Sequence, residues 1–494
     1  MAGLIRRALV RVRMGPNGSN PAGRVTIAAL VVLLIVGISL RVYFMAVWRP
    51  ALLGFTDSAV YLNDAFVSTF WDPLRVVGYG LFLRWAHDLG GNLSTTILLQ
   101  HALGVATGLF LYAAARRIGG PSWLALPGAA VVLLGGQQLF VEHAVLSEAV
   151  FGFLNCAALW CAARTLDSSR LRWSLAAGAL LGLAACVRLA IALVPLAIAG
   201  WLLLTGPERR LARLRAPAVL IAGLLIPLTA YQIAHHHSTG TWSITRAGNY
   251  NLYARAATFA NCHKFTPPPG TARLCEDTPP ARRPGPSFYA FGASPANLVY
   301  GGTAQFPPND AAIRHVGAFA RAAIRGQPLD YASTVAQNAW RFLSPGSFTA
   351  HSGESQAQLI DQLFAPANYQ LTAGLVKSVY GTPALLQRHG VAHLRTYERH
   401  TRFNAVILLI LAALVVTGAI VARERARVGV ALFGLNAAAL AVTPALTLFY
   451  DARYAIPTYG PLVAAAAFGA WGAYERATKR DGAGAPAQPA GAGE

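Results

Sequence analysis

Long apolar runs alternate with short basic clusters along most of this chain. The first run extends from Val25 to about Val47, and the second begins at Leu93. An α-helix rises about 1.5 Å per residue, so about 20 apolar residues can cross the hydrocarbon core of a bilayer. The runs are too long and too continuous for the strands of a barrel. We therefore expect an all-α polytopic membrane protein.

The later runs extend this pattern to about ten spans. The stretch 173–204 is apolar except for Arg188, too long for one span and short for two. We interpret it as two short spans that meet at an outer turn carrying Arg188. The other expected spans are 25–47, 93–115, 123–142, 144–163, 216–234, 403–422, 428–447 and 454–473.

The basic clusters between the apolar runs predict the orientation of the chain. Residues 1–24 carry Arg6, Arg7, Arg11, Arg13 and Arg24, and later clusters include Arg116–Arg117, Arg164–Arg172, Arg209–Arg215 and Arg423–Arg427. Cytoplasmic loops of membrane proteins are enriched in Lys and Arg. We therefore expect both termini in the cytoplasm. This placement accounts for the net charge of +21 without a nucleic-acid partner.

Two polar segments interrupt the spans and complete the expected domain organisation. They are an outer loop, 48–92, and an extracytoplasmic domain, 235–400. In the second segment, Asn309 or Asp310 could cap a helix to about Ile324, and Pro328 could begin another that ends at Ser344–Pro345. The remaining units are a basic N-terminus, 1–24, a transmembrane module, 25–234, C-terminal spans, 401–474, and a low-complexity cytoplasmic tail, 475–494.

Composition supports the membrane assignment and narrows the chemistry. The chain of 494 residues is 55% hydrophobic and 12% charged, about half the charged fraction of a soluble domain. Its mean hydropathy is +0.44. The bias toward Ala, Arg, Gly and Pro is typical of a GC-rich bacterial genome. The sequence has no Walker loop, nucleotide fingerprint or zinc spacing, which argues against the use of ATP or a nucleotide sugar.

The five cysteines fall into two groups. Cys156, Cys161 and Cys186 lie in apolar runs and are expected to be packing residues. Cys262 and Cys275 lie in the polar segment 235–400, which we place on an oxidising exterior. We predict a disulfide between them, worth on the order of 3 kcal/mol. The alternative is two free thiols.

A few ionisable residues lie where the spans reach the expected outer face. Ionisable groups near the membrane are costly unless they are paired or hydrated, so each is a functional candidate. We interpret Glu142 as a solvated loop residue, and we consider Asp57 as a partner for Arg41. Consecutive histidines on a helix point about 100° apart, so we interpret 235–237 as interfacial rather than metal-binding. The full set is Asp57, Glu142, Glu148 and Asp451 with Arg41, Arg188, Arg453, Tyr454 and His235–His237.

Group transfer from a lipid phosphate suits this arrangement. An acceptor hydroxyl needs a general base close to the reacting carbon, and a carboxylate at the interface can serve. The leaving phosphate needs cationic groups, and the planar guanidinium of Arg fits a phosphate well. A long prenyl tail needs an apolar groove between spans.

Several segments resemble the GT-C superfamily of polytopic glycosyltransferases. The likeness is closest to the protein mannosyltransferase-like and aminoarabinose transferase-like branch, glycosyltransferase family 39. Order and spacing match from the first span to about residue 205, and again at the last span. The segments are TDSAVYL with Asp57 and Tyr61; RVVGYGLFLRW, similar to R-x-P-G-Y-P-L-F-L; LLQHALGVATGLFLYAAARRIGG; VEHAVLSEAVFGFL with Glu148; CVRLAIALVPLA with Arg188; and YDARYAIPTYGPL with Arg453 and Tyr454.

This resemblance implies a reaction and a set of site residues. The donor would be a polyprenyl-phosphate sugar, and the acceptor a hydroxyl of an envelope glycan, lipid or protein. Transfer would occur by single displacement with inversion at the sugar carbon, at the outer face of the membrane. Asp57 and Glu148 would be the catalytic carboxylates. Tyr61, Arg75, Arg188, Arg453 and Tyr454 would bind substrate. No cofactor is certain, and a divalent metal held by Asp57, Glu148 and Asp451 stays open.

The sequence differs from the family pattern at three positions. Ser58 replaces a second acid that often follows the first loop's Asp, and Val77 and Gly80 replace two prolines. Asp57 could instead cap a helix over 58–66.

Other assignments are open too. Glu148 could be a polar contact between helices, and Arg453 an arginine that reaches the membrane interface. The alternative function is a non-catalytic transporter, flippase or scaffold for lipid-linked envelope precursors. Charges at the outer helix ends, rather than at the bilayer midplane, favour the enzyme.

Overall fold

The computed structural model describes residues 21–166, 171–206, 210–301, 309–345, 355–381 and 390–483. Within these ranges the chain is helical and contains no strand, only an isolated parallel bridge between Leu52 and Ala144. The expected all-α class is therefore confirmed. Several residues of the sequence argument lie outside the described ranges: Arg6, Arg7, Arg11, Arg13, Arg170, Arg209 and the tail 484–494.

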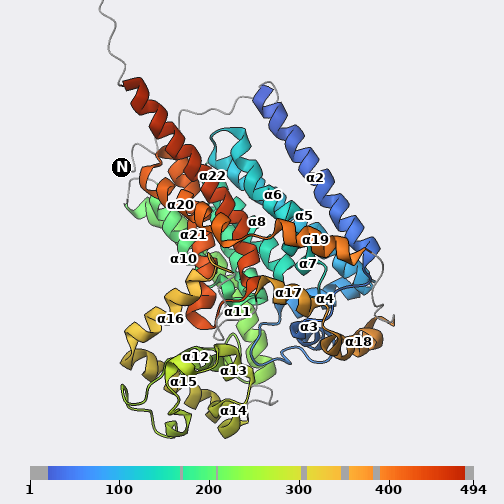
Figure 1. Ribbon diagram of the computed structural model, residues 1–494, viewed down its shortest axis with the longest axis vertical. Helices are drawn as coiled ribbons and strands as arrows, with labels where there is room; N and C mark the ends of the chain where they lie inside the picture. Colours follow the sequence, from blue (N-terminus) through green and yellow to red (C-terminus); the bar gives the residue numbers. More distant parts are fainter. Residues whose placement is uncertain are drawn as a thin grey trace, which may run out of the picture.

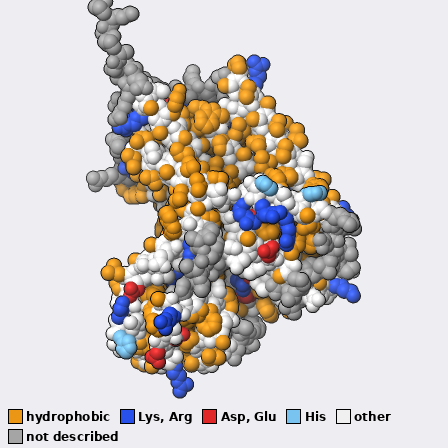
Figure 2. Space-filling model, in the orientation of Figure 1, with side chains coloured by type: hydrophobic (Ala, Val, Ile, Leu, Met, Phe, Trp, Pro, Cys, Tyr) orange, Lys and Arg blue, Asp and Glu red, His pale blue; other side chains and the backbone are white. Residues whose placement is uncertain are grey.

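The expected apolar runs coincide with helices that form the upper lobe of the molecule (Figure 1). Hydrophobic side chains cover most of the visible face of this lobe (Figure 2). The helices are α2 (Pro21–Val47), α5 (Leu93–Ile118), α6 (Leu126–Leu134), α7 (Gly136–Glu142), α8 (Glu148–Arg164), α9 (Arg172–Val187), α10 (Val194–Thr205), α11 (Arg210–Thr239), α20 (Ala405–Val421), α21 (Glu424–Thr447) and α22 (Ala452–Ala483).

Among the described residues, four of these helices are long and apolar enough to cross a membrane, namely α2, α5, α11 and α21. The number rises to six if two bent pairs are counted as one span each. One pair runs from the short helix η1 (Ser122–Ala125) through α6 to α7 with a bend of 52°, and the other joins α19 (Val391–Thr401) to α20 with a bend of 43°. Helices such as α9 and α10 are apolar but shorter. The chain is thus a multi-pass membrane protein, and its described residues contain fewer full-length spans than the ten expected.

The two short helices expected around Arg188 are present. Arg188 is extended, with φ −162° and ψ 126°, and separates α9 from the short helix η2 (Leu189–Ile191) and α10. On its other side α9 packs closely on α11, where a Cβ on Gly178 would collide with the backbone of Leu220. Small residues at such contacts allow membrane helices to approach each other. This contact holds α9 against α11.

A polar lobe below the bundle has its own hydrophobic cluster (Figure 1). Asn309 caps α15 by accepting hydrogen bonds from the backbone N–H groups of Ala311 and Ala312, and Pro328 begins α16, as predicted. The second helix ends at Trp340, before the expected stop at Ser344. A disulfide joins Cys262 to Cys275. The helices are α12 (Gly248–Ala257), α13 (Pro286–Phe291), α14 (Pro295–Tyr300), α15 (Asp310–Gly326) and α16 (Pro328–Trp340).

The C-terminal part of the polar segment, in its described residues from Gln356 to Thr401, does not pack on the polar lobe but on the main core. Three helices join the main core together with the first loop: α17 (Gln356–Leu363) with Leu359 and Leu363, α18 (Pro366–Tyr380) with Val376, and α19 with Leu394. The backbone N–H of Gly54 donates to the Leu363 carbonyl at 3.0 Å. Segment 235–400 therefore contains two parts with different cores.

The first loop folds into two short helices beneath the bundle, α3 (Thr56–Phe66) and α4 (Gly78–Asp88) (Figure 1). They pack against each other, and α18 packs on α3. Both helices bury one face, so the loop is a fixed part of the structure rather than a solvated connection.

Candidate functional site

Helix α3 presents Asp57, Tyr61 and Asp64 on one buried face, because residues four and three apart lie on the same side of a helix. The helix begins at Thr56, its N-cap is Phe55, and no side chain caps it. Asp57 lies in the first turn. The alternative assignment of Asp57 as a helix cap is therefore wrong, and its carboxylate has other partners.

Asp57 is held between two arginines. Its Oδ1 accepts from Arg75 Nη2 at 2.6 Å, and its Oδ2 accepts from Arg453 Nη1. Arg75 comes from the loop before α4 and also pairs with Asp72 at 2.8 Å, whereas Arg453 lies in the first turn of α22. Asp57 is 2% exposed. Burial alone would raise the pKa of Asp57, but the two guanidinium groups outweigh it and hold this pKa well below its usual range.

A second acid–arginine pair lies beside the first. Glu148, the first residue of α8, accepts from Arg188 Nη1 through Oε1. The same Oε1 lies 4.0 Å from Arg453 Nη1, so Arg453 contacts both carboxylates. Glu148 Oε2 is buried and has no hydrogen-bond partner among the described residues. This oxygen is the one carboxylate oxygen of the two pairs that is not engaged by a guanidinium.

Aromatic rings fix the guanidinium planes. The Arg188 guanidinium carbon lies 4.4 Å from the ring centre of Tyr454. The Arg453 carbon lies 4.5 Å from the ring of Phe55 and 5.3 Å from that of Tyr454. Such cation–π contacts engage the faces of the guanidinium groups, whose N–H groups donate to the carboxylates of Asp57 and Glu148.

Tyr61 joins the cluster through Ser147. The Tyr61 hydroxyl lies 3.2 Å from Ser147 Oγ, which also accepts from Arg188 Nη1 at 3.3 Å. The structure thus brings all seven expected site residues together: Asp57, Tyr61, Arg75, Glu148, Arg188, Arg453 and Tyr454. The sequence argument missed Ser147, Phe55 and Asp72. Ser147 precedes Glu148 directly, and Phe55 lies two residues before Asp57, so proximity in sequence was the available signal.

The carboxylates of this cluster do not form a metal site. Asp451 Oδ1 accepts from the backbone N–H of Arg453 at 2.9 Å, and its Oδ2 lies 3.8 Å from Arg453 Nε. Asp57 and Glu148 are likewise paired with arginines. Among the residues that the structure describes, no three His, Cys, Asp or Glu side chains are grouped to hold a metal ion. The residues present therefore do not fit a divalent metal.

The partner expected for Arg41 is wrong. Arg41 Nε and Nη2 each donate to Glu142 at 2.9 Å, and His101 Nδ1 lies 3.0 Å from the same carboxylate. Glu142 is fully buried, not solvated as expected. The bend between α6 and α7 turns Glu142 inward onto α2 and α5. Asp57 does not contact Arg41 and pairs with Arg75 and Arg453 instead.

Two departures from the family pattern have a structural account. The backbone N–H of Val77 lies 3.3 Å from the Tyr231 hydroxyl, and a proline there would have no N–H to donate. A Cβ on Gly80 would lie 3.0 Å from the Cβ of Asp64, so Gly80 permits the close packing of α4 on α3. Ser58 is fully buried, and nothing in the structure explains its presence.

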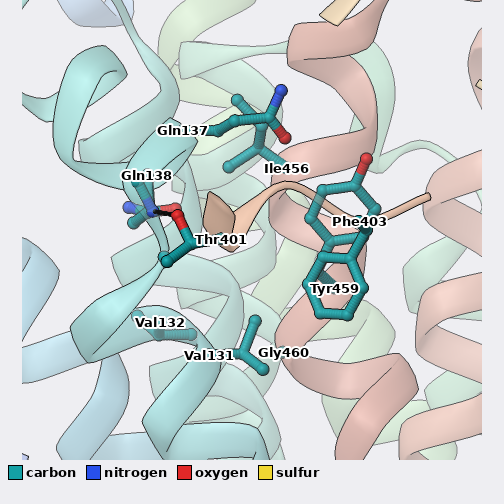
Figure 3. Close-up of a pocket in the computed structure, with 11 residues that line it drawn as sticks. Val131, Val132, Gln137, Gln138, Thr401, Phe403, Ile456, Tyr459 and Gly460 are labelled. Atoms are coloured by element: carbon teal, nitrogen blue, oxygen red, sulfur yellow. Dashed lines mark hydrogen bonds between the residues drawn. The ribbon is translucent and has the colours of Figure 1, made fainter. Parts of the chain in front are cut away.

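A separate small pocket lies between the two bent helix pairs and α22 (Figure 3). The rings of Phe403 and Tyr459 lie beside it, with their centres 4.7 Å apart, and Gln137 points toward Ile456. Thr401 Oγ1 accepts from the backbone N–H of Gly136 at 3.0 Å. None of the residues that line it is Asp, Glu, His, Lys or Arg, and none belongs to the expected site.

We predict that the stability of the folded protein depends on pH through the buried carboxyl group of Asp64. Burial raises the pKa of Asp64 to about 7, from an ordinary value of 3.8, and its Oδ2 has no partner among the described residues. The folded protein therefore binds this proton more tightly than the unfolded chain, and the resulting stability is lost as the pH rises from about 4 through 7. Asp64→Asn should raise the melting temperature at pH 8 but not at pH 4. The gain in free energy of unfolding has an upper limit of about 4 kcal/mol, from about 1.4 kcal/mol per pKa unit.

Thermal unfolding of the two proteins across this pH range checks the prediction. The exposed Asp88 of α4 provides a control, because Asp88→Asn should shift the melting temperature little at any pH. A stabilisation by Asp64→Asn that is the same at pH 4 and pH 8 would contradict a neutral Asp64.

Comparisons with known proteins relate part of the chain to a family. The family model of dolichyl-phosphate-mannose-protein mannosyltransferase matches residues 77–232, from the start of α4 into α11. This segment contains Glu148 and Arg188, whereas Asp57 and Arg453 lie outside it. No curated protein matches the sequence.

Two solved structures are similar in fold. One is the archaeal oligosaccharyltransferase AglB from Archaeoglobus fulgidus in complex with an inhibitory peptide and a dolichol-phosphate, with 12% identity, a TM-score of 0.45 and coverage of 94% of this chain. The other is the Archaeoglobus fulgidus oligosaccharyltransferase in the apo form, with 12% identity, a TM-score of 0.47 and coverage of 94%. This chain spans about half the length of each, 52% and 53% respectively.

The family match supports glycosyl transfer in a membrane. It covers the stretch in which the motifs around Glu148 and Arg188 were found. Residues 77–232 thus carry the signature of the dolichyl-phosphate-mannose-protein mannosyltransferase family, and the GT-C resemblance of the sequence is confirmed over that segment.

Proposed function

We propose that this protein transfers a sugar from a polyprenyl-phosphate donor to a hydroxyl group of an acceptor in the bacterial cell envelope, which is a glycan, a lipid or a protein. The observation that carries the proposal is the position of Asp57 between Arg75 and Arg453, beside the Glu148–Arg188 pair. Guanidinium groups suit the phosphate of the donor, and a carboxylate suits the proton of the acceptor.

The transfer step follows from these groups. The acceptor oxygen bonds to the anomeric carbon while the bond from that carbon to the phosphate oxygen breaks. The electron pair leaves with the phosphate, whose charge Arg75, Arg188 and Arg453 neutralise. Asp57 takes the proton of the acceptor hydroxyl. Attack from the face opposite the phosphate inverts the sugar carbon.

Donor binding also prepares the base. Without a substrate, both oxygens of Asp57 are engaged by arginines, which makes it a weak base. A donor phosphate competes for Arg75 and Arg453, and Glu148 already shares Arg453. As the guanidinium groups turn toward the phosphate, Asp57 loses part of their stabilisation and its basicity rises. The base is therefore activated only when a donor is present.

The distribution of charge supports an extracytoplasmic site. Glu148 begins α8, whereas Arg164 ends it, and Arg116 and Arg117 end α5. The carboxylate–arginine cluster thus lies at the opposite helix end from basic residues that are typical of the cytoplasmic side. In this orientation both termini are cytoplasmic, the polar lobe is outside, and the donor presents its phosphate at the outer leaflet of the cell membrane.

Reconstitution into vesicles tests the function. The purified chain is supplied with a radiolabelled polyprenyl-phosphate sugar and an envelope extract as acceptor. We expect release of polyprenyl phosphate and label in the acceptor with inverted configuration, and no label from a nucleotide sugar. Donor that crosses the bilayer without being consumed would favour a flippase, and donor that stays intact in place would favour a scaffold.

A further inference from the structure

Two buried histidines lie where α2, α5 and α7 meet (Figure 1). His101 belongs to α5, and His143 follows directly after α7. Both side chains are buried, and the transfer step uses neither of them. His101 Nε2 lies 3.0 Å from His143 Nδ1, which is a hydrogen-bond distance. One of these two inner nitrogens must therefore carry a proton.

The outer nitrogen of each ring also has a fixed partner. His101 Nδ1 lies 3.0 Å from Glu142 Oε2. His143 Nε2 lies 3.1 Å from the Trp48 carbonyl oxygen. The Glu142 carboxylate accepts two further bonds from Arg41, both at 2.9 Å, and a carboxylate paired in this way with a guanidinium is ionised. Since an ionised carboxylate and a carbonyl oxygen can only accept, both outer nitrogens donate.

These contacts require one proton more than two neutral imidazoles hold. A neutral imidazole has one N–H, and in each ring the outer nitrogen already carries it. The inner nitrogens of two neutral rings would face each other with lone pairs at 3.0 Å. An additional proton turns this repulsion into a hydrogen bond. His101 is the better place for the proton, because its ring then donates to the Glu142 carboxylate and to His143 together.

The charges around the two rings suit an imidazolium. Arg41 and Glu142 neutralise each other, and Glu142 is in direct contact with His101. Neither η1 nor α6 has a titratable residue, and α21 and α22 meet α5 further along, at Gly119 and Leu111. The other titratable or charged groups on the elements packed here are Tyr79 of α4, Glu148 of α8 with its partner Arg188, and Tyr397 and the Glu398–Arg402 ion pair of α19.

The backbone beside His143 leads to both carboxylates of the transfer site. The backbone N–H of Leu52 donates to the His143 carbonyl at 2.9 Å. The N–H of Val145 donates to the Leu52 carbonyl at 3.3 Å. The chain after Leu52 leads to Asp57, and the chain after Val145 leads to Glu148. A displacement of His143 is therefore transmitted to both carboxylates through the backbone.

The residue before His101 holds the same backbone. Gln100 Nε2 donates to the carbonyls of Glu142 and Ala144, each at 2.8 Å, and its Oε1 accepts from the Tyr79 hydroxyl. The ring of Tyr79 packs edge-on against that of Tyr61, with centres 4.8 Å apart. Two adjacent side chains of α5 thus hold the turn between α7 and α8, one through its backbone carbonyls and one through His143.

We propose that His101 is a positioning residue of the transfer site, and that it holds a proton, shared with His143, which keeps segment 142–148 in place. The proposal deepens the proposed function and rests on it. Loss of this proton to solvent leaves two lone pairs face to face, so the rings move apart. His143 then moves with the backbone that leads to Glu148, and Arg188 loses its position for the donor phosphate. The transfer site is competent only while the proton is bound.

Nitrogen NMR of the full chain with ¹⁵N-labelled histidine, in reconstituted bilayers, tests the proton directly. Exposed histidines titrate at a pH of about 6.5 and are neutral at pH 8. At pH 8 we expect one doubly protonated ring in the wild-type chain and in His263→Gln, a control at an exposed position. His143→Gln and His101→Gln should both lose this signal, because the amide supplies the donor or acceptor that the remaining neutral ring needs.

The pH dependence of transfer tests the positioning role. The kcat/KM of the wild-type chain should fall by about tenfold per pH unit above the pH at which the doubly protonated ring disappears, the effect of one ionisation. His263→Gln should keep this step, and His143→Gln should lack it.

Three results would overturn the proposal: no doubly protonated histidine in the wild-type chain at pH 8, transfer that does not change where the ring loses its proton, or the same step in His143→Gln. The wild-type spectrum decides the first point even if a variant does not fold. Absence of transfer in every chain would instead contradict the proposed function, and the NMR measurement, which needs no transfer, separates the two outcomes.

Discussion

Asp57→Asn is expected to reduce sugar transfer at least about a hundredfold, the lower range for the loss of a general base. The amide cannot take the proton of the acceptor hydroxyl. It also no longer neutralises Arg75 and Arg453, but these keep other carboxylates, Asp72 at 2.8 Å and Asp451 at 3.8 Å. We therefore expect the variant to fold and to lose kcat rather than donor binding. Initial rates over a range of donor concentrations measure this.

Asp72→Asn is the matched control for this variant. It removes the other carboxylate on Arg75, but Asp72 makes no contact with Arg453 or Glu148 among the described ion pairs. Transfer should fall by less than about tenfold, because only the orientation of one guanidinium changes. Near-normal transfer by Asp57→Asn would remove Asp57 from the mechanism. Equal losses in the two variants would mean that Asp57 acts only by holding Arg75.

Local features of the fold could be predicted from the sequence because they depend on neighbouring residues. The turn at Arg188 followed from one charge in an apolar stretch of a given length. The start of α15 at Asn309 and of α16 at Pro328 followed from capping preferences. The apolar runs located the helices of the bundle. In each case the signal and the structure lie within a few residues of each other.

Features that depend on which surfaces meet could not be derived in this way. Arg41 pairs with Glu142 rather than Asp57, because the bend between α6 and α7 turns Glu142 inward. Hydropathy indicates how deep a residue lies in the membrane, but it does not indicate which side chain pairs with it. The two bends and the shortness of α9 and α10 also reduce the number of continuous spans among the described residues. Likewise, the sequence argument treated 235–400 as one domain and did not reveal that α17, α18 and α19 pack with the first loop and not on the polar lobe.

The candidate site is intermediate between these cases. Motif resemblance selected its residues one by one, but Asp57 and Arg453 are 396 positions apart in sequence, and nothing local predicts their contact. The pairing of both Asp57 oxygens with arginines was not foreseen. It changes the chemistry, because a carboxylate held in this way is a weak base until the donor competes for its partners.

Glu148→Gln is expected to lower kcat/KM for the donor by about ten- to a hundredfold, mainly through KM. Glu148 Oε1 holds Arg188, and an amide oxygen holds a guanidinium less firmly than a carboxylate does. Arg188 would then be misplaced for the donor phosphate, while Asp57 could still take the proton. Kinetics at varied donor concentration separate the two parameters, and Glu148→Asp, which keeps the charge, should recover part of the loss.

The Glu148–Arg188 ion pair also predicts how Glu148→Gln combines with Arg188→Gln. Arg188→Gln should raise KM by a similar factor, and the double variant should lose little more than either single one, because both remove the same contact. If Glu148→Gln instead lowers kcat as far as Asp57→Asn does, and its effect adds to that of Arg188→Gln, Glu148 takes the proton itself. Its Oε2, which is free of hydrogen bonds to the described residues, would then be the reacting atom, and Asp57 would serve to hold Arg75 and Arg453.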